Sequence, residues 1–260
     1  MRGRRRAAWR SVARWWLAAA LASGTPAARA QATPPPPSFR WWTPQDTRYG
    51  IAALAAVVVT GAFDAKLQSR IAFAGGDPAN RLADAVQPFG TPIVWAPALL
   101  LAAGAGHVSG HRDWTSASVR IAVSGVVAAA ADGALKLAFG RARPSESPDD
   151  PYDFKPFSGQ VSFPSGHATL AFAMAAVISH ETGSRWVPWV GYPLAGLVGW
   201  SRVHDNEHWT SDVVAGAALG AWVAVESDDW LRARRGATGA VEPFVGASGR
   251  SLDVGLERRF

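Results

Sequence analysis

The sequence predicts an all-α protein, a helical bundle of about six helices that is embedded in a membrane. Three observations indicate this class. Beyond Trp41, apolar stretches alternate with polar loops, and the stretches carry helix-forming residues rather than the period of two that is typical of strands. Tryptophans recur near the ends of these stretches, as in the aromatic belt of a membrane protein. An arginine cluster, residues 232–235, follows the last stretch and resembles a cytoplasmic flank.

A soluble exported bundle is the alternative to a membrane-embedded one. Several apolar runs have only about 14 to 16 residues, fewer than the roughly 20 that are needed to cross the hydrocarbon of a bilayer. The mean hydropathy of +0.03 is modest. Alanine-rich helices blur this signal, so hydropathy does not decide between the two forms.

The first 30 residues are expected to be a signal peptide or an N-terminal anchor. They combine an arginine-rich start, a short apolar stretch at 15–22 and the small-residue cleavage pattern Ala-Arg-Ala at 28–30. An uncleaved anchor is the alternative reading, because the apolar stretch is short and Arg29 is unusual beside a cleavage site.

The rest of the chain divides into a linker, one helical domain and a tail. Residues 31–47 are expected to be a Pro-rich linker, because the run Pro34–Pro37 can neither continue a helix nor pair in a sheet. A helical domain is expected to cover 48–230, and residues 231–260 form the C-terminal tail, whose two alternating runs are compatible with a short β-hairpin. The expected helices cover about 48–63, 91–106, 117–140, 166–180, 187–200 and 210–226.

Composition excludes several classes of protein. The chain has no cysteine, which excludes a disulfide scaffold, a cysteine-based metal site and a cysteine nucleophile. The net charge of +6 does not indicate nucleic acid as a partner, because the arginines concentrate at 2–14 and 232–235. Those two runs are typical of targeting and membrane-flank signals.

A first cluster of polar residues lies at the end of the apolar stretch 117–140. Lys136 and Arg143 are seven residues apart, two helical turns, so both can face one side if the helix continues that far. A lysine within an apolar helix costs about 2.5–3.5 kcal/mol even on the lenient insertion scale, so it should be paired or functional. Asp132, four residues earlier, offers a purely structural ion pair as the alternative explanation.

A second cluster, Pro164-Ser165-Gly166-His167, lies directly before a predicted helix. Ser165 is a candidate N-cap, and Gly166 lets a ligand approach the backbone closely. The amides at the start of a helix form a favourable anion site. Taken alone, the cluster is also compatible with an ordinary cap and a structural histidine.

A third cluster runs from Ser201 to Asp212. His208 and Asp212 are one helical turn apart, so the carboxylate can accept a hydrogen bond from one imidazole nitrogen and leave the other nitrogen free and nucleophilic. Arg202 adds a planar fork that suits phosphate oxygens. A metal site is the alternative interpretation, because one continuous helix would bring together three possible ligands at i, i+4 and i+8, namely His204, His208 and Asp212.

These clusters together resemble a known family. Lys-x6-Arg-Pro at 136–144, Pro-Ser-Gly-His at 164–167 and Ser-Arg-x5-His-x3-Asp at 201–212 are similar to the three signature motifs of the type 2 phosphatidic acid phosphatase superfamily. Every signature position matches. Residues 1–115 and the tail after about 230 lie outside the resemblance.

The resemblance implies a phosphatase that acts through a phosphohistidine. His208 would be the nucleophile, Asp212 would orient it, and His167 would serve as general acid and base. No metal or cofactor would be required, because cationic groups would neutralise the phosphate. The phosphate-binding groups that the resemblance implies are Lys136, Arg143, Ser165, Gly166 and Arg202.

The expected substrate is a lipid phosphate or a prenyl diphosphate, because the site joins apolar helices. A soluble exported acid phosphatase is the runner-up, and a vanadium haloperoxidase or a non-catalytic membrane scaffold are further alternatives. The expected location is the cell envelope, in the inner membrane with the site on the periplasmic face, or else a soluble periplasmic or secreted form. The sequence does not indicate an oligomeric state, the number of spans or the individual substrate.

Overall fold

The protein was analysed as a computed structural model, which describes residues 42–237, 241–248 and 251–258. These residues form eight α-helices, one 3-10 helix and two strands. In chain order the helices are α2 (Pro44–Gly61), α3 (Asp64–Ile71), α4 (Gly76–Val86), η1 (Gln87–Gly90), α5 (Pro92–Val108), α6 (Arg112–Phe139), α7 (Gly166–Thr182), α8 (Val187–His204) and α9 (Thr210–Ala237). The strands are β1 (Val241–Ser248) and β2 (Ser251–Arg258), which pair antiparallel from Val241↔Arg258 to Ser248↔Ser251.

The predicted helical bundle is confirmed, and each of the six expected helices has a counterpart. Two short helices, α3 and α4, were not expected, because eight and 11 residues are too few for a clear helical period. Helix α2 begins at Pro44, inside the expected linker, because Thr43 and Asp46 form a capping box ahead of it. Helix α9 continues to Ala237, into the expected tail. The predicted export signal at 1–30 and most of the linker lie outside the described residues.

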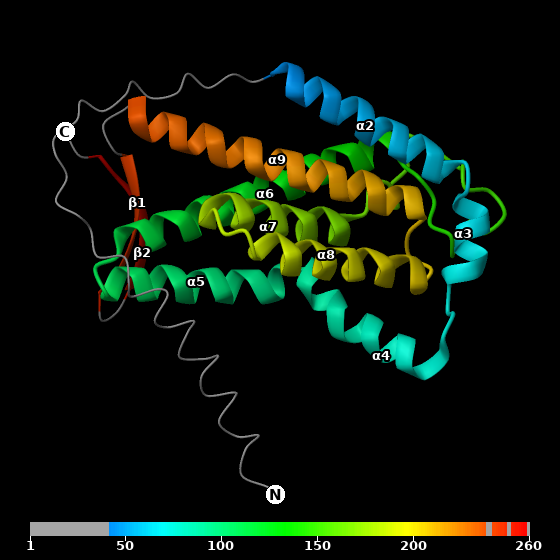
Figure 1. Ribbon diagram of the computed structural model, residues 1–260, viewed down its shortest axis with the longest axis horizontal. Coiled ribbons are helices and arrows are strands. Elements are labelled where there is room, and N and C mark those ends of the chain that lie inside the picture. Colours follow the sequence, from blue (N-terminus) through cyan, green and yellow to red (C-terminus); the bar gives the residue numbers. More distant parts are fainter. Residues whose placement is uncertain (1–41, 238–240, 249–250, 259–260) are drawn as a thin grey trace, which may run out of the picture. The chain divides into compact units, whose positions relative to one another are not determined.

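Helix α7 lies at the centre of the bundle, with α6, α8 and α9 around it (Figure 1). Its buried side chains are mostly alanines, together with Met174 and Val177, and small side chains let neighbouring helices approach closely. One hydrophobic cluster joins α7 to α6 and α9, and a second joins it to α8 and α4. Helix α7 is therefore packed on more than one side by its neighbours.

Two glycines of α9 set the distance between α9 and α7. Gly216 and Gly220 are four residues apart, and a Cβ on either would collide with the backbone of α7, at 2.5 Å from the Ser165 oxygen or 2.0 Å from the Thr169 oxygen. This small-xxx-small spacing is a common device for close helix packing. It places Asp212, one turn earlier on α9, beside the first residues of α7.

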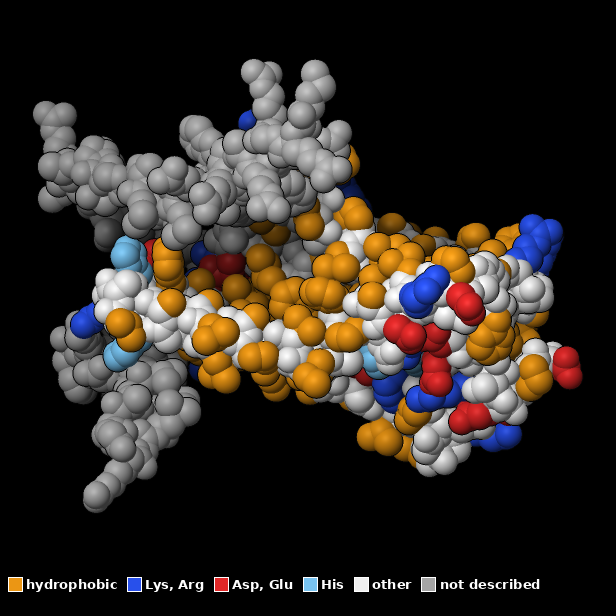
Figure 2. Space-filling view, turned by 90° about the horizontal axis from the view of Figure 1, so that it is seen from below, with side chains coloured by type: hydrophobic (Ala, Val, Ile, Leu, Met, Phe, Trp, Pro, Cys, Tyr) orange, Lys and Arg blue, Asp and Glu red, His pale blue; other side chains and the backbone are white. Residues whose placement is uncertain are grey.

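The exposed surface of the bundle is strongly apolar. Leu101 and Val108 of α5 are 75% and 88% exposed, and Trp189 of α8 is 76% exposed. Figure 2 shows a broad band of hydrophobic side chains along one face, with charged side chains gathered toward one end. Among the described residues, α6 is long and apolar enough to cross a membrane, and the candidate spans number up to three if each of two bent helix pairs is one span. An apolar face of this extent is typical of contact with lipid or with a partner.

Candidate active site

The three motif clusters meet at one end of the bundle, because α6 and α8 end where α7 and α9 begin. The last turns of α6 and α8 carry Lys136 and Arg202, and the first turns of α7 and α9 carry His167 and Asp212. The remaining predicted site residues, Arg143, Ser165, Gly166 and His208, lie in or next to the connecting segments.

Lys136 is directed at the loop that leads into α7. Its ammonium donates to the carbonyl oxygen of Val161 at 2.9 Å and also to that of Pro164. The expected partner Asp132 lies 3.6 Å away, so the structural ion pair is present as well. Gly166 packs on the same pair, because a Cβ there would lie 3.2 Å from an Asp132 oxygen. Lys136 therefore holds its position beside the start of α7.

Two of the predicted phosphate-binding residues each bury a polar atom that has no hydrogen-bond partner among the described residues. These atoms are the Ser165 hydroxyl oxygen and the Arg202 Nε. Ser165 occupies the predicted N-cap position of α7, but its side chain makes no capping hydrogen bond. A buried polar group without a partner costs about 1–3 kcal/mol, so such groups are retained where a ligand uses them. Both groups can donate to an anion at the α7 N-terminus.

The environment of His167 shows that the cationic groups converge. Gly90 of η1 packs against it, and a Cβ at Gly90 would lie 2.8 Å from the Cβ of His167. Burial is the largest cause that lowers the pKa of His167 from 6.5 to about 4. Interactions with the cationic side chains of Arg202, Lys136 and Arg143, and with the neighbouring His208, lower it further.

The hydrogen-bond partner of His208 determines which of its ring nitrogens carries the hydrogen. Its Nδ1 lies 2.8 Å from the carbonyl oxygen of Ser162, and a carbonyl oxygen can only accept. Nδ1 therefore carries the hydrogen, and the lone pair of Nε2 is free. The side chain is only 5% exposed, so the ring is fixed in this orientation.

Asp212 lies near His208 but does not make the expected hydrogen bond to it. Its Oδ2 is 3.7 Å from Nδ1 of His208, and instead accepts from the Ser162 hydroxyl at 2.6 Å and the Trp209 amide at 2.9 Å. Oδ1 accepts from Arg141 at 2.5 Å. Burial favours the neutral carboxyl, but interactions with His208 and Arg141 outweigh it and hold the pKa of Asp212 below its usual value. The carboxylate is therefore ionised and fully hydrogen-bonded.

Two acidic side chains contact the arginines of the site. Glu207 pairs with Arg143, and Asp205 pairs with Arg202. The side chain of Arg143 is the more exposed of the two, at 32% against 6% for Arg202. Glu207 and Asp205 lie outside the signature motifs, and sequence reasoning assigned neither of them a role.

Sequence reasoning also missed Arg141, Asp64 and Ser162. Arg141 is 2% exposed and bonds both Asp64 and Asp212. For Arg141, the only local signal in the sequence was its position between Lys136 and Arg143. Nothing in the sequence near Asp64 marks that residue as a member of the site. Ser162 bonds Asp212 through its hydroxyl and His208 through its carbonyl.

The rival metal site on one continuous helix is not formed. Helix α8 ends at His204 and α9 begins at Thr210, so His204, His208 and Asp212 do not share a helix. The Nε2 of His204 pairs with Asn80 at 2.8 Å, and its ring stacks on Trp200. His204 is thus a buried packing residue.

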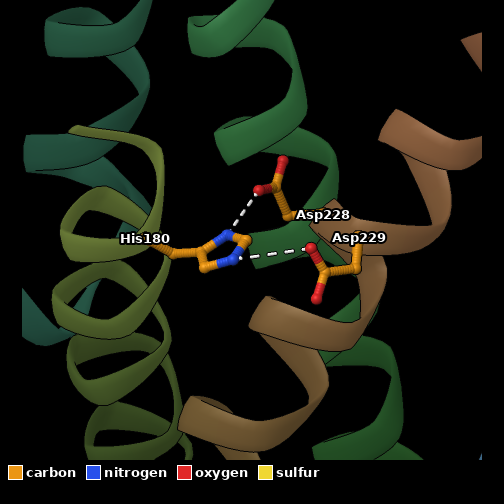
Figure 3. Close-up of side chains that lie close together, drawn as sticks. All are labelled: His180, Asp228 and Asp229. Atoms are coloured by element: carbon orange, nitrogen blue, oxygen red, sulfur yellow. Dashed lines mark hydrogen bonds and ion pairs between the residues drawn. The ribbon is translucent and has the colours of Figure 1, made fainter. Parts of the chain in front are cut away.

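A second polar cluster lies at the far end of α7. His180, Asp228 and Asp229 bring three possible metal ligands within 4.8 Å of one another, and Figure 3 shows the imidazole between the two carboxylates. However, the Asp228 carboxylate also accepts from Arg120 at 3.1 Å and Arg232 at 2.8 Å. Two guanidinium groups at one carboxylate disfavour a cation there, so the cluster is best described as an ion-pair network.

Comparison with known proteins agrees with this arrangement. Residues 117–235 match the PAP2 superfamily. A lipid A 1-phosphatase of Porphyromonas gingivalis is 31% identical over 71% of this chain and 38% of its own length. An undecaprenyl-diphosphatase of Sulfolobus acidocaldarius is 31% identical over 56% of this chain and 67% of its own length. The chain thus spans less than half of the first of these relatives.

Two solved structures share the fold. LpxE of Aquifex aeolicus superposes with a TM-score of 0.51 at 21% identity, covering 64% of this chain and 94% of that one. A transmembrane PAP2-type phosphatidylglycerolphosphate phosphatase of Bacillus subtilis gives a TM-score of 0.53 at 19% identity, covering 69% and 94%. The motifs gather at one end of this shared fold, and the undecaprenyl-diphosphatase is matched over two thirds of its own length. The chain therefore belongs to the PAP2 superfamily.

Proposed function

We propose that the protein is a phosphatase that hydrolyses phosphomonoesters or diphosphates of lipids through a phosphohistidine on His208. The observation that carries the proposal is a pair of buried donors without a partner among the described residues, Ser165 Oγ at the start of α7 and Arg202 Nε at the end of α8. They lie in the same cluster as three cationic side chains and two imidazoles. Such a set complements a tetrahedral oxyanion whose charge is spread over several oxygens.

The chemistry would proceed in two transfers. The Nε2 lone pair of His208 forms a bond to phosphorus while the bond from phosphorus to the ester oxygen breaks and its electron pair stays on that oxygen. His167 donates the proton that the leaving oxygen needs. His167 then removes a proton from a water molecule, whose oxygen attacks phosphorus and releases His208 and inorganic phosphate. Lys136, Arg143 and Arg202 neutralise the phosphate charge in both steps, and we propose that no metal is needed.

The choice of a lipid substrate rests on the surface of the bundle and on the relatives. Exposed side chains of α5 and α8 are largely apolar, and α6 is long enough to cross a membrane. The relatives are named for lipid A and for undecaprenyl diphosphate. We propose a membrane location in the cell envelope with the site on the periplasmic face.

The test is phosphate release by the full chain in detergent. The panel contains lipid A, phosphatidate, phosphatidylglycerophosphate, a prenyl diphosphate and p-nitrophenyl phosphate, each with and without a chelator. We expect turnover of a lipid substrate that the chelator does not change. Turnover of the water-soluble ester alone, without a need for detergent, would instead indicate a soluble acid phosphatase.

Two variants test the assignment of residues. His208→Ala should remove nearly all turnover, and His107→Ala, an exposed histidine of α5, is the matched control. Arg202→Ala should lower kcat about 10²–10³-fold, as loss of one transition-state donor usually does. Wild-type turnover by His208→Ala would refute the nucleophile.

A further inference from the structure

We propose that Asp64 and Arg141 are positioning residues that, through Asp212, set the charge beside His208. This inference rests on the proposed function. Asp64 is the first residue of α3 and lies outside the part of the chain that matches the family. It is joined to the site only by tertiary contacts.

The side chains of Asp64, Arg141 and Asp212 form one buried row of charged groups. Arg141 places Nη1 at 2.5 Å from Oδ1 of Asp212 and Nη2 at 2.8 Å from Oδ2 of Asp64. Both carboxylates are completely buried, and Arg141 is 2% exposed. Ser211 closes the row, because its amide donates to Asp64 Oδ1 at 2.9 Å and its hydroxyl to Oδ2 at 2.5 Å. The row therefore has a single geometry rather than a choice of several.

Arg141 is itself held on every side. Its Nε donates to the carbonyl oxygen of Pro151 at 2.9 Å. The guanidinium also lies over the rings of Phe154 and Trp209, at 5.0 and 5.5 Å from their centroids. Because the guanidinium is fixed in this way, it holds the carboxylates of Asp64 and Asp212 at set positions relative to each other.

Asp212 influences the position and the charge of the His208 ring in two ways. Ser162 bridges the two residues, since its hydroxyl bonds the Asp212 carboxylate and its carbonyl oxygen accepts from Nδ1 of His208. The carboxylate charge also acts directly, at 3.7 Å from Nδ1. In a buried site a charge at that distance is weakly screened.

The charges explain why a second carboxylate is present. Asp212 and Arg141 alone would sum to zero, whereas Asp64 brings the formal charge of the row to −1. When Nε2 of His208 bonds phosphorus while Nδ1 keeps its hydrogen, the ring becomes cationic. An excess negative charge beside the ring stabilises that form. Asp64 therefore leaves the charge of Asp212 available to the imidazole rather than neutralised by Arg141.

The other charged or titratable groups near this pair of histidines are held constant in the test. Asp132 of α6 and His167 of α7 interact with His208. Lys136, Arg143 and Arg202, which come from α6, the segment after it and α8, surround His167.

Three variants of the full chain in detergent separate charge from structure. Asp64→Asn brings the row to 0, Arg141→Gln brings it to −2, and the double variant restores −1. Three quantities are measured, namely kcat and KM on the best lipid substrate and the pH midpoint of the His208 ring by NMR, assigned with His208→Gln. Asp77→Asn, at the exposed start of α4, is the matched control.

We expect Asp64→Asn to lower kcat by about tenfold or more with KM within about twofold, and to move the His208 midpoint down by about one pH unit. Arg141→Gln should move the midpoint up, and the double variant should return it close to the wild-type value. If Asp64→Asn does not fold, Arg141→Gln and the double variant carry the comparison. Midpoints that do not follow the charge of the row, or a kcat of Asp64→Asn equal to wild type, would overturn the inference. The midpoints can be read in a protein without turnover, so a wild type that fails every substrate would count against the proposed function alone.

Discussion

The two histidines of the site have opposite surroundings. His208 donates to a carbonyl oxygen and has Asp212 nearby, whereas the groups around His167 are mainly cationic. The lowered pKa of His167, about 4, means that its protonated fraction falls about tenfold for each pH unit above that value. A general acid must carry its proton, so the role proposed for His167 favours an acidic optimum.

The first prediction is that kcat/KM on an alkyl phosphate is at least about tenfold higher at pH 5 than at pH 8. The loss of protonated His167 causes the decline. The measurement is a pH profile, with the enzyme returned to one pH after each incubation to show that it stays folded. An ester with a good leaving group, such as p-nitrophenyl phosphate, should show a flatter decline because it needs less help from an acid. A kcat/KM that rises from pH 5 to pH 8 on the alkyl ester would contradict the role of His167.

At the scale of single elements, the packing of α9 on α7 decides where the site residues stand. Gly220→Ala is expected to destabilise the protein by about 1–3 kcal/mol, because the new Cβ would lie 2.0 Å from the Thr169 carbonyl oxygen. Gly196→Ala is the matched control, since no atom lies within 4 Å of its Cβ position and alanine favours a helix. Thermal unfolding in detergent measures both. Equal unfolding temperatures for Gly220→Ala and wild type would show that α9 does not pack this tightly.

The opposite ends of α7 and α9 are joined by the ion-pair network around Asp228. The hydrogen bond with Asp228 is the largest cause that raises the pKa of His180 above 6.5. A raised folded-state pKa adds stability that is fully present below pH 6.5 and is lost as the pH rises through the folded-state value. His180→Gln should therefore lower the free energy of unfolding more at pH 5.5 than at pH 9.

Denaturant unfolding at the two pH values measures that difference. His107→Gln, on an exposed position of α5, should show no such dependence. A loss that is the same at both pH values would mean that His180 contributes only through packing.

At the scale of the whole molecule, α6 runs from the end of the bundle that carries the proposed active site to the opposite end. Its 28 residues extend about 42 Å at 1.5 Å per residue, more than the thickness of the hydrocarbon core. Ser109 lies before α6 and Ser145 lies after it, and both are exposed. A membrane-spanning α6 would place them on opposite sides.

The chain has no cysteine, so single cysteines can be labelled without background. In intact cells, an impermeant maleimide should label Ser145→Cys, whereas Ser109→Cys should react only after permeabilisation. The cysteine-free wild type is the control. Labelling of both positions in intact cells would contradict a spanning α6, and the reverse pattern would place the site on the cytoplasmic face.

The sequence by itself determined the helical class, the six main helices and the residues of the three motifs. These features depend on local patterns, namely apolar runs, caps and short spacings, which a linear sequence carries directly. The tertiary structure decided which groups fill the space between the motifs. Asp64 meets Arg141 across 77 positions of the chain, and Ser162 takes the hydrogen bond that the i, i+4 spacing of His208 and Asp212 predicted between those two. The physical reason is that a buried charge is paired by whichever group the packing brings within about 3 Å, and packing joins residues that no local pattern relates.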